Sequence, residues 1–373
     1  MALTLMEGNE AIAWGAMRAG CRFYAGYPIT PATTIFNTMM RLLPPSGGYC
    51  IQGEDEIASI GMCLGASMAG LKVMTATSGP GLSLYSEHIS FAIGSEIPIV
   101  IVVVQRLGPS TGSATRGADG DIQFMRWGNS GGQPVIVLSP SDVKDCFELT
   151  VHAFNLAEQY RCPVFVASNK EVGMTRESLD MDQVKLPEIV NRRQPPPERP
   201  FLPFATDSEQ GVPYFLPIGG RVLVRQTSST HGPDGYITTD PEQIAFNQER
   251  LMRKITDSIE TFSFHESHME QGAETLVITY GVTARAAKDL YLGCKRAKRP
   301  ISLLILKTLW PVPEKLIVEK ARQHRRIVVF EMNKGQYVRE IRRILPDKRV
   351  QFFGQMNGQL ISPTQMQEVI DNG

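Results

Sequence analysis

The segment at residues 72–104 reads KVMTATSGPGLSLYSEHISFAIGSEIPIVIVVV. Its apolar start, residues 72–77, is typical of a strand and runs into the turn sequence TSGPG. Residues 82–93 carry apolar side chains at helical spacing. The segment ends in IPIVIVVV at residues 97–104, a continuous β-branched run typical of a strand buried on both faces. Strand, helix and buried strand in this order predict one unit of a parallel sheet.

The same alternation extends on both sides of this segment. Further helices are expected at residues 10–20, 34–43, 55–70 and 143–159. Further strands are expected at residues 21–26, 134–138 and 163–167. Repeated strand–helix alternation predicts an α/β fold with a doubly wound parallel sheet.

The periodicity is lost after this first part of the chain and then returns. Residues 185–217 are rich in proline and arginine and indicate a linker or wrapping segment. One strand is expected at residues 221–225 and a helix at residues 241–262. Strands are expected again at residues 275–280, 301–306 and 326–331, with helices between them. We therefore predict domains at residues 1–184 and 271–373, the second smaller, joined by a linker at residues 185–270.

The composition excludes several classes of protein. The chain has 373 residues, 42% of them hydrophobic, and its 38 basic residues balance its 38 acidic ones. A neutral balance does not favour nucleic-acid binding. No apolar run is long enough for a membrane span, and no basic segment at the start indicates a secretory signal. We expect a soluble protein of the cytoplasm.

The cysteines lack the spacing of a metal or cluster site. None forms a CxxC pair, so no iron–sulfur or zinc site is expected in this chain. Scattered cysteines of this kind usually behave as small buried hydrophobic residues. The six are Cys21, Cys50, Cys63, Cys146, Cys162 and Cys294.

Two of the four segments that could carry chemistry follow predicted strands. The first is YPITP, in which two prolines fix the backbone around a hydroxyl at the carboxyl end of a strand, where open α/β sheets bind ligands. On local composition alone, a rigid turn into a helix is the simpler explanation. Its residues are Tyr27, Pro28, Ile29, Thr30 and Pro31. The second is Arg106, whose fork matches a carboxylate, although a surface arginine in a loop is the plain alternative.

The other two segments lie at predicted helix starts. Glu56 ends the acidic run EDE and opens a helix of small residues, which allows close approach of another chain or a cofactor. An ordinary acidic cap is the plain alternative. The turn TSGPG can accept a polar or anionic ligand or be a simple connection. Its residues are Thr77, Ser78, Gly79, Pro80 and Gly81.

The sequence GADGD at residues 117–121 resembles the start of a magnesium–diphosphate signature. No asparagine follows at the spacing that this signature needs, and the acidic residues stand in a polar stretch. We interpret GADGD as structural and expect no metal ligand in this chain. Phosphate-loop, serine-hydrolase and zinc-protease motifs are absent as well.

Together these segments resemble a known family. A glutamate, a glycine–alanine pair ten residues on, a strand and TSGPG are similar to the pyrimidine-binding domain of thiamine-diphosphate enzymes. YPITP with QRLGPSTG resembles the alpha subunits of 2-oxoacid:ferredoxin oxidoreductases. The run QGEDEIASIG, GASMAG and VMTATSGPGLSL is more similar to the 2-oxoglutarate members than to the pyruvate or branched-chain members. LKTLWPVP and VVFEMNKGQ resemble the family's transketolase C-terminal-like domain.

The resemblance implies roles for particular residues. The cofactor-activating glutamate falls on Glu56, the substrate threonine on Thr30 and the arginine for the substrate carboxylate on Arg106. A carboxylate at N1′ of the aminopyrimidine favours the imino tautomer, which relays general-base catalysis. Thr77–Gly81 would contact the cofactor, with Ser110 and Thr111 near the substrate. Candidates for the second carboxylate of 2-oxoglutarate are Ser110, Thr111, Arg116, Arg126 and His231.

The resemblance also implies cofactors and partners. Thiamine diphosphate would be shared with a beta subunit that carries Mg²⁺ and a [4Fe-4S] cluster, with coenzyme A as co-substrate and ferredoxin as electron acceptor. The expected assembly is an (αβ)₂ heterotetramer, with or without further small subunits. The implied reaction is oxidative decarboxylation of 2-oxoglutarate to succinyl-CoA. Alternatives are the same chemistry on pyruvate or branched-chain 2-oxoacids, a non-oxidative thiamine enzyme, and a non-catalytic scaffold.

Overall fold

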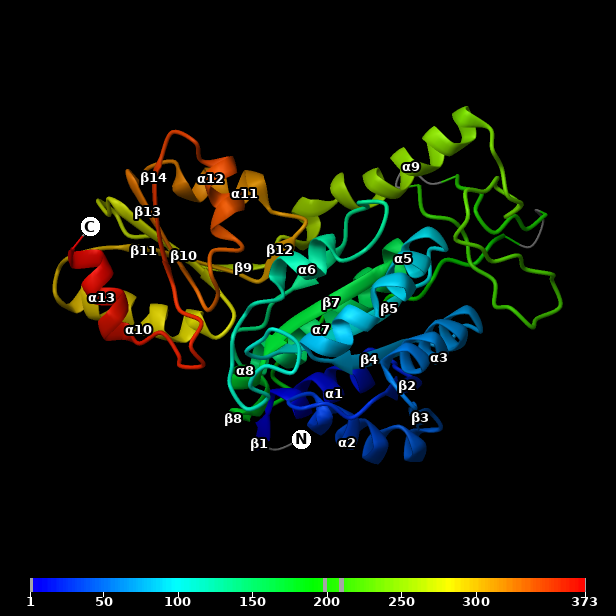
Figure 1. Cartoon of the computed structure of the whole chain (residues 1–373), viewed down its shortest axis with the longest axis horizontal. Coiled ribbons are helices and arrows are strands. Elements are labelled where there is room, and N and C mark those ends of the chain that lie inside the picture. The colour runs from blue at the N-terminus through cyan, green and yellow to red at the C-terminus, as the bar shows by residue number, and fades with distance from the viewer. Residues whose placement is uncertain (1–2, 197–199, 208–210, 373) are drawn as a thin grey trace.

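The computed structural model describes residues 3–196, 200–207 and 211–372. In this part of the chain, seven strands form the larger sheet, and its order confirms the predicted doubly wound topology (Figure 1). Neighbouring strands are parallel, except that β12 runs antiparallel to β6. In spatial order the strands are β12 (Thr308–Trp310), β6 (Ile136–Leu138), β7 (Pro163–Asn169), β5 (Ile99–Gln105), β4 (Val73–Thr77), β2 (Phe23–Gly26) and β3 (Tyr49–Gln52).

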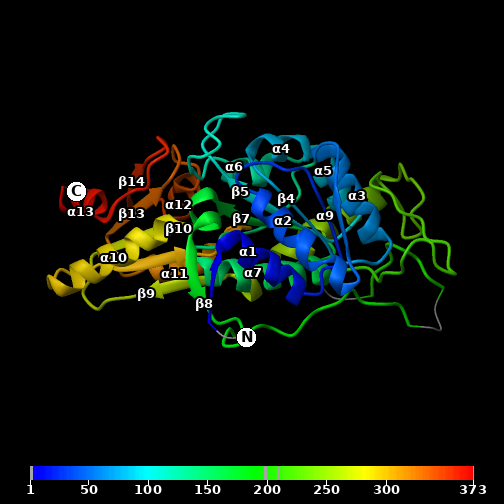
Figure 2. The same cartoon turned by 90° about the horizontal axis from the view of Figure 1, so that it is seen from below.

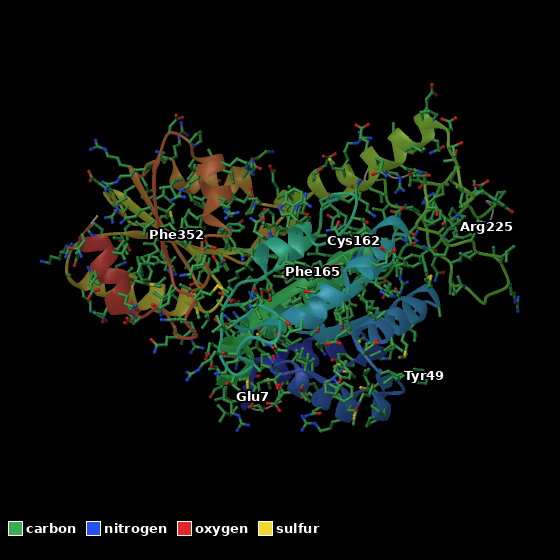
Figure 3. The ribbon with its side chains drawn as sticks, viewed as in Figure 1. Glu7, Tyr49, Cys162, Phe165, Arg225 and Phe352 are labelled. Atoms are coloured by element: carbon green, nitrogen blue, oxygen red, sulfur yellow. The ribbon has the colours of Figure 1, made fainter. Side chains whose placement is uncertain are left out.

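Helices cover both faces of this sheet, which explains the continuous apolar run in β5. Val100, Val102 and Val104 pack in one core cluster with α1 (Gly8–Arg18), α2 (Thr33–Leu42) and α7 (Val143–Tyr160). Ile99, Ile101 and Val103 pack on the other face, with α3 (Glu56–Met68) and α5 (Ser86–Gly94). Phe165 of β7 lies in the middle of the sheet, whereas Tyr49 marks its outer edge (Figure 3).

The helix predicted at residues 82–93 is divided in two. A short α4 (Gly79–Leu84) precedes α5, and Tyr85 lies between them. The Tyr85 side chain is fully buried, and its hydroxyl lies 2.9 Å from Thr75 Oγ1. A short α6 (Ile122–Trp127), which the sequence did not predict, packs on the same face of the first sheet as α3 and α5.

A second sheet of five described strands forms the other α/β unit. The strands predicted at 275–280 and 326–331 are confirmed as β10 (Thr275–Tyr280) and β13 (Arg326–Glu331), and β11 (Ser302–Leu306) lies within the third predicted range. The spatial order is β14 (Arg349–Gly354), β13, β10, β11 and β9 (His265–His268). The covering helices are α10 (Thr283–Arg296), α11 (Glu314–Ala321), α12 (Val338–Ile344) and α13 (Pro363–Asp371). Strand β12 follows β11 in the chain but pairs with β6, so a strand from the second part of the chain forms one edge of the first sheet.

The described residues between 185 and 240, here called the wrapping segment, lie mainly at the opposite end of the first unit from the second sheet (Figure 2). It contacts the amino edge of the first sheet, where Ile218 N–H donates to Met68 O at 3.0 Å and Gln226 donates to Ser95 O. The strand predicted at residues 221–225 is wrong. This stretch pairs with no described strand, and Leu223 is 94% exposed, so its apolar alternation has no sheet to bury it.

Helix α9 (Pro241–Thr256) ties this segment to the first unit and, with a 3₁₀ turn at Ile259–Phe262, confirms the helix predicted there. Arg250 and Lys254 hold the fully buried Glu96 carboxylate at 2.7 and 2.8 Å. Burial alone would raise the pKa of Glu96, but the two cations lower that pKa to about 2. The anchor is therefore ionic at neutral pH.

The chain's first strand, β1 (Thr4–Glu7), pairs antiparallel with β8 (Arg176–Leu179), which follows the short α8 (Lys170–Met174). The sequence predicted none of these three elements. Among the described helices, none combines the length and the apolar character that crossing a membrane requires.

Candidate active site

The four predicted segments meet at one edge of the first sheet. Strands β3, β2, β4 and β5 are consecutive neighbours, and all four are parallel. Their carboxyl ends lead into EDE, YPITP, TSGPG and Arg106, respectively. The chain leaves β2 toward β3 but leaves β4 toward β5, so the order reverses between β2 and β4. Such a switch point is where open α/β sheets bind ligands.

Glu56 is buried against the TSGPG turn. Asp55 caps helix α3 by accepting a hydrogen bond from Ala58 N–H at 2.7 Å, so the cap does not need Glu56. The Glu56 side chain lies beside Gly81, because a Cβ built on Gly81 would lie 2.7 Å from Glu56 Oε1. Glu56 is 7% exposed, and no hydrogen bond to its carboxylate comes from the described residues. A buried carboxylate without a protein donor is available to a ligand.

The TSGPG turn has a second unused polar group. Ser78, between β4 and α4, is fully buried, and its Oγ has no hydrogen-bond partner within the described chain. A Cβ on Gly81 would also lie 2.1 Å from Thr77 Oγ1, so glycine keeps this corner open between Thr77 and Glu56. Burial raises the pKa of the nearby Tyr85 hydroxyl above its usual range, and the charge of Glu56 adds to the effect.

Arg106 joins the YPITP turn. Its Nη1 donates to Thr30 O at 2.6 Å, while its Nε is buried and has no acceptor among the described residues. Burial lowers the pKa of Arg106, and the charge of Asp121 opposes this effect. The Thr30 side chain itself is exposed, and Pro31 O accepts from Asn9 Nδ2 at 2.9 Å. A threonine hydroxyl and an arginine with a free N–H are thus brought to one place.

The remaining YPITP residues support this turn. Tyr27 is 40% exposed, and Pro28 is half-buried. Ile29 packs against the core on the α1 side of the sheet, and its carbonyl accepts from Thr33 N–H at 3.0 Å. The turn therefore fixes the backbone on one side and leaves Tyr27 and Thr30 open to solvent.

Two acidic residues of GADGD are less open to solvent than a polar stretch suggests. Asp119 is buried, and Asp121 is half-buried, with an Oδ2 that is buried and has no hydrogen-bond partner among the described residues. Burial raises the pKa of Asp121 to about 6, and the charge of Arg106 opposes the rise. Asp121 Oδ2 lies 3.2 Å from where a Cβ on Gly79 would be, so Asp121 borders the TSGPG turn.

Asp119 lies deeper, where the two units meet. Its Oδ1 accepts from Asn169 Nδ2 at 2.8 Å, and its N–H donates to Met332 O at 2.9 Å. Burial raises the pKa of Asp119 to about 7, despite the lowering effect of Asn169. The sequence held no signal for this burial, because the covering residues come from β13 and the loop after it.

The residues expected to bind the second carboxylate of 2-oxoglutarate do not lie together in one place. Ser110 and Thr111 are exposed in the loop after β5, and Arg116 packs its stem on Gly358. Arg126 donates to Gly132 O and Gln133 O and stacks on Trp127, so its donors are engaged locally. His231 stacks on Phe204 within the wrapping segment. None of these five candidates makes a described contact with Arg106.

The comparisons with known proteins decide the family. A family model described as pyruvate flavodoxin/ferredoxin oxidoreductase, thiamine diphosphate-binding, matches residues 14–250, which is more than half of the chain. The chain belongs to the 2-oxoacid:ferredoxin oxidoreductases. A second model, pyruvate:ferredoxin oxidoreductase core domain II, matches residues 273–366 of this family member. The resemblance found in the sequence is confirmed.

Among its curated relatives, this chain is more similar to two 2-oxoglutarate synthase subunits than to a ketoisovalerate oxidoreductase subunit. The chain is 39% identical to the 2-oxoglutarate synthase subunit KorA of Methanothermobacter thermautotrophicus, covering 98% of this chain and 97% of the relative. It is also 39% identical to KorA of Methanocaldococcus jannaschii over 99% of this chain and all of the relative. Identity to the ketoisovalerate oxidoreductase subunit VorB of the first organism is 33%, over 97% of this chain and 95% of that one.

A solved structure agrees with the fold. The 2-oxoglutarate:ferredoxin oxidoreductase of Magnetococcus marinus, with 2-oxoglutarate, coenzyme A and succinyl-CoA bound, matches at a TM-score of 0.93 and 30% identity. The match covers 99% of this chain but 65% of that chain, so this chain spans about two thirds of its length. A split-gene transketolase matches at a TM-score of 0.53 and 12% identity, which shows a shared fold alone.

Proposed function

We propose that this chain is the alpha subunit of a thiamine-diphosphate-dependent 2-oxoglutarate:ferredoxin oxidoreductase. The proposed reaction oxidatively decarboxylates 2-oxoglutarate with coenzyme A to succinyl-CoA and CO₂, and passes the electrons to ferredoxin. The observation that carries the proposal is the buried, donor-free Glu56 beside Gly81 at the switch point of the sheet. The KorA relatives support 2-oxoglutarate as the substrate, since their identity exceeds that of the ketoisovalerate relative.

The residues at this edge fit the aminopyrimidine half of thiamine diphosphate. Gly81 leaves space beside the Glu56 carboxylate that a Cβ would fill, and Ser78 Oγ has no described partner. Glu56 would hold a proton at N1′ of the pyrimidine, with Thr77–Gly81 forming the adjoining wall. Bound thiamine diphosphate supplies a thiazolium that accepts the electron pair released as CO₂ departs.

Arg106 and the YPITP turn would hold the substrate. Arg106 Nη1 already donates to Thr30 O, which orients the guanidinium and leaves the free Nε–H for the first carboxylate of a 2-oxoacid. The exposed Thr30 hydroxyl would donate to the 2-oxo group, with Tyr27, Pro28, Ile29 and Pro31 shaping this side. Ser110 and Thr111, in the exposed loop after β5, would offer hydroxyl donors to the substrate. Fixing carboxylate and carbonyl together orients the reacting carbon.

We infer that a beta subunit supplies the parts that this chain's residues do not fit. These are the Mg²⁺–diphosphate site, the [4Fe-4S] cluster and contacts to ferredoxin, in an (αβ)₂ complex of the cytoplasm. The description of the curated relatives as subunits supports a partner. Among the described residues, no group of three or more His, Cys, Asp or Glu side chains lies close enough together to hold a metal ion.

The proposal is tested on the complex that purifies with this chain. We expect a brown iron–sulfur complex whose kcat/KM for 2-oxoglutarate exceeds that for pyruvate and 2-oxoisovalerate by at least about tenfold, because a charge-assisted contact to the second carboxylate contributes about 1.5–3 kcal/mol. Equal or better use of pyruvate would overturn the substrate while leaving the thiamine chemistry in place. A colourless complex without 2-oxoacid turnover would favour a scaffold instead.

A further inference from the structure

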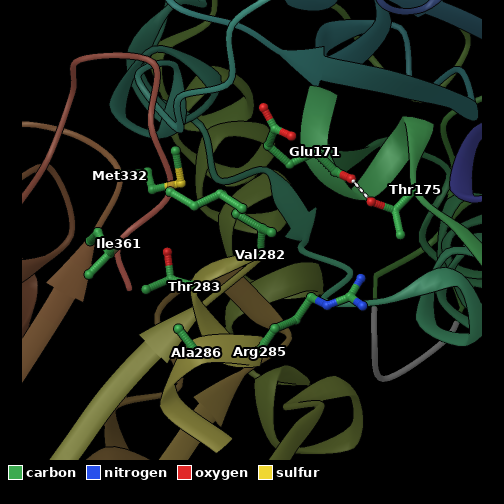
Figure 4. Close-up of a pocket in the computed structure, with 9 residues that line it drawn as sticks. Glu171, Thr175, Val282, Thr283, Arg285, Ala286, Met332 and Ile361 are labelled. Carbon is green, nitrogen blue, oxygen red and sulfur yellow. Dashed lines mark hydrogen bonds between the residues drawn. The ribbon is translucent and has the colours of Figure 1, made fainter. Parts of the chain in front are cut away.

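A cavity of about 290 Å³ lies between the two units, apart from the edge that carries Glu56 and Arg106. Figure 4 shows it between α8 and the start of α10, with Met332 and Ile361 on a third side. Its size exceeds the space of about 15 Å³ that a single water needs. None of its lining residues is among those proposed for thiamine or 2-oxoacid binding. The cavity is therefore a separate space.

Thr283 gives this cavity an unused donor. The residue is 3% exposed, and its Oγ1 has no hydrogen-bond partner in the described chain. Figure 4 shows its hydroxyl pointing into the cavity. The other hydroxyl there is engaged, since Thr175 Oγ1 donates to Glu171 O at 2.5 Å. A buried hydroxyl without a partner is costly, so it indicates a missing acceptor.

The helix that begins at this residue favours an anionic acceptor. Thr283 is the first residue of α10, a helix of 14 residues, and the positive end of the helix dipole lies at the cavity. The N–H groups of Ala284 and Arg285 donate to Gly281 O and Val282 O, whereas the Thr283 N–H has no acceptor among the described residues. The Thr283 hydroxyl in the cavity and the unpaired N–H of the same residue together resemble the donors of anion sites at helix starts.

The remaining walls limit the kind of anion. Val282, Ala286, Met332 and Ile361 provide an apolar lining. Arg285 at the rim is already paired with Glu177 at 2.5 Å. Glu171 on the opposite wall is paired with Lys170 at 3.3 Å, so this wall offers a second carboxylate a like charge and no free cation.

We propose that this cavity binds a short aliphatic monocarboxylate. Its carboxylate accepts from the Thr283 hydroxyl and N–H at the start of α10, and its hydrocarbon chain lies on the apolar walls. A dicarboxylate is disfavoured, because its second charge would face Glu171. The inference stands independently of the proposed function, which concerns the other edge of the first sheet.

The test is an NMR titration of the full chain with butyrate, succinate and butyramide. Butyrate should bind saturably, and succinate and butyramide should bind at least about tenfold more weakly. Thr283→Val should weaken butyrate by about tenfold, the effect of one charge-assisted hydrogen bond. Thr283→Ser keeps the hydroxyl and should bind as the wild type does. Glu171→Gln should raise the affinity for succinate toward that for butyrate, because the variant removes the like charge on the opposite wall.

The proposal would be overturned by a lack of saturable butyrate binding, by equal binding of succinate, or by a Thr283→Val variant that binds butyrate as tightly as wild type. Arg106→Ala separates the two sites. This variant should keep full butyrate affinity, and Thr283→Val should keep 2-oxoglutarate turnover in the complex. Loss of butyrate binding in Arg106→Ala alone would place the probe at the proposed active site, and would refute this inference without touching the proposed function.

Discussion

Gly81→Ala is a direct probe of the geometry around Glu56. The added Cβ would lie 2.7 Å from Glu56 Oε1 and 2.1 Å from Thr77 Oγ1, whereas ordinary contact begins at 3.4 Å. The carboxylate must therefore retreat by about 0.7 Å and the hydroxyl by about 1.3 Å. Misplacement of a catalytic group by about 1 Å costs on the order of 100-fold in rate. We expect that loss in kcat, with about 1–3 kcal/mol of destabilisation from overpacking.

The assay is 2-oxoglutarate-dependent reduction of an electron acceptor by the purified complex, together with urea unfolding of the chain. Gly293→Ala is the matched control, because a Cβ at this position in α10 meets no atom within 4 Å. That variant should keep full activity and gain about 0.5–1 kcal/mol of stability, as alanine suits a helix better than glycine. Activity of Gly81→Ala within threefold of wild type would refute the assigned geometry.

Two further predictions concern Arg106 at this edge and Asp119, which lies deeper, where the two units meet. Arg106→Ala should lower kcat/KM by about tenfold or more for 2-oxoglutarate, pyruvate and 2-oxoisovalerate alike, because Arg106 would hold the carboxylate that all three share. A loss confined to 2-oxoglutarate would instead place Arg106 at the second carboxylate of that substrate. Burial raises the pKa of Asp119 from 3.8 to about 7, so its neutral form favours the fold and stability falls as the pH rises through 7. Urea midpoints should fall less between pH 5.5 and 8.5 in Asp119→Asn than in wild type, and parallel pH profiles would contradict this.

The sequence predicted the first sheet because buried parallel strands leave a local signature. The run at residues 97–104 alternates its side chains between two helical layers, so both sets must be apolar, and β5 lies there. The site segments could be predicted for a related reason. Each follows a strand, and adjacent parallel strands end at one edge of a sheet. Their gathering follows from topology, without knowledge of the contacts.

Features that depend on distant partners could not be predicted. Strand β12 has three residues, and it exists because β6 offers an edge to a segment from the other end of the chain. Asp119 is buried because Asn333 Nδ2 donates to its carbonyl and Met332 O accepts its N–H. Nothing local distinguishes Asp119 from a solvated loop residue. The stretch at residues 221–225 is the opposite case. Its local pattern predicts a strand, but no neighbouring strand is there to pair with it.

The most direct test of the account is the rate of CoA-dependent 2-oxoglutarate oxidation by complexes carrying Glu56→Gln. Glutamine has nearly the same shape but cannot hold a proton as a carboxylate does, so folding and assembly should persist. Glu54→Gln is the matched control, because Glu54 is exposed two residues away. The account predicts that Glu56→Gln removes nearly all turnover and Glu54→Gln little. A Glu56→Gln complex with more than about a tenth of wild-type turnover, roughly 1.4 kcal/mol of barrier, would contradict it.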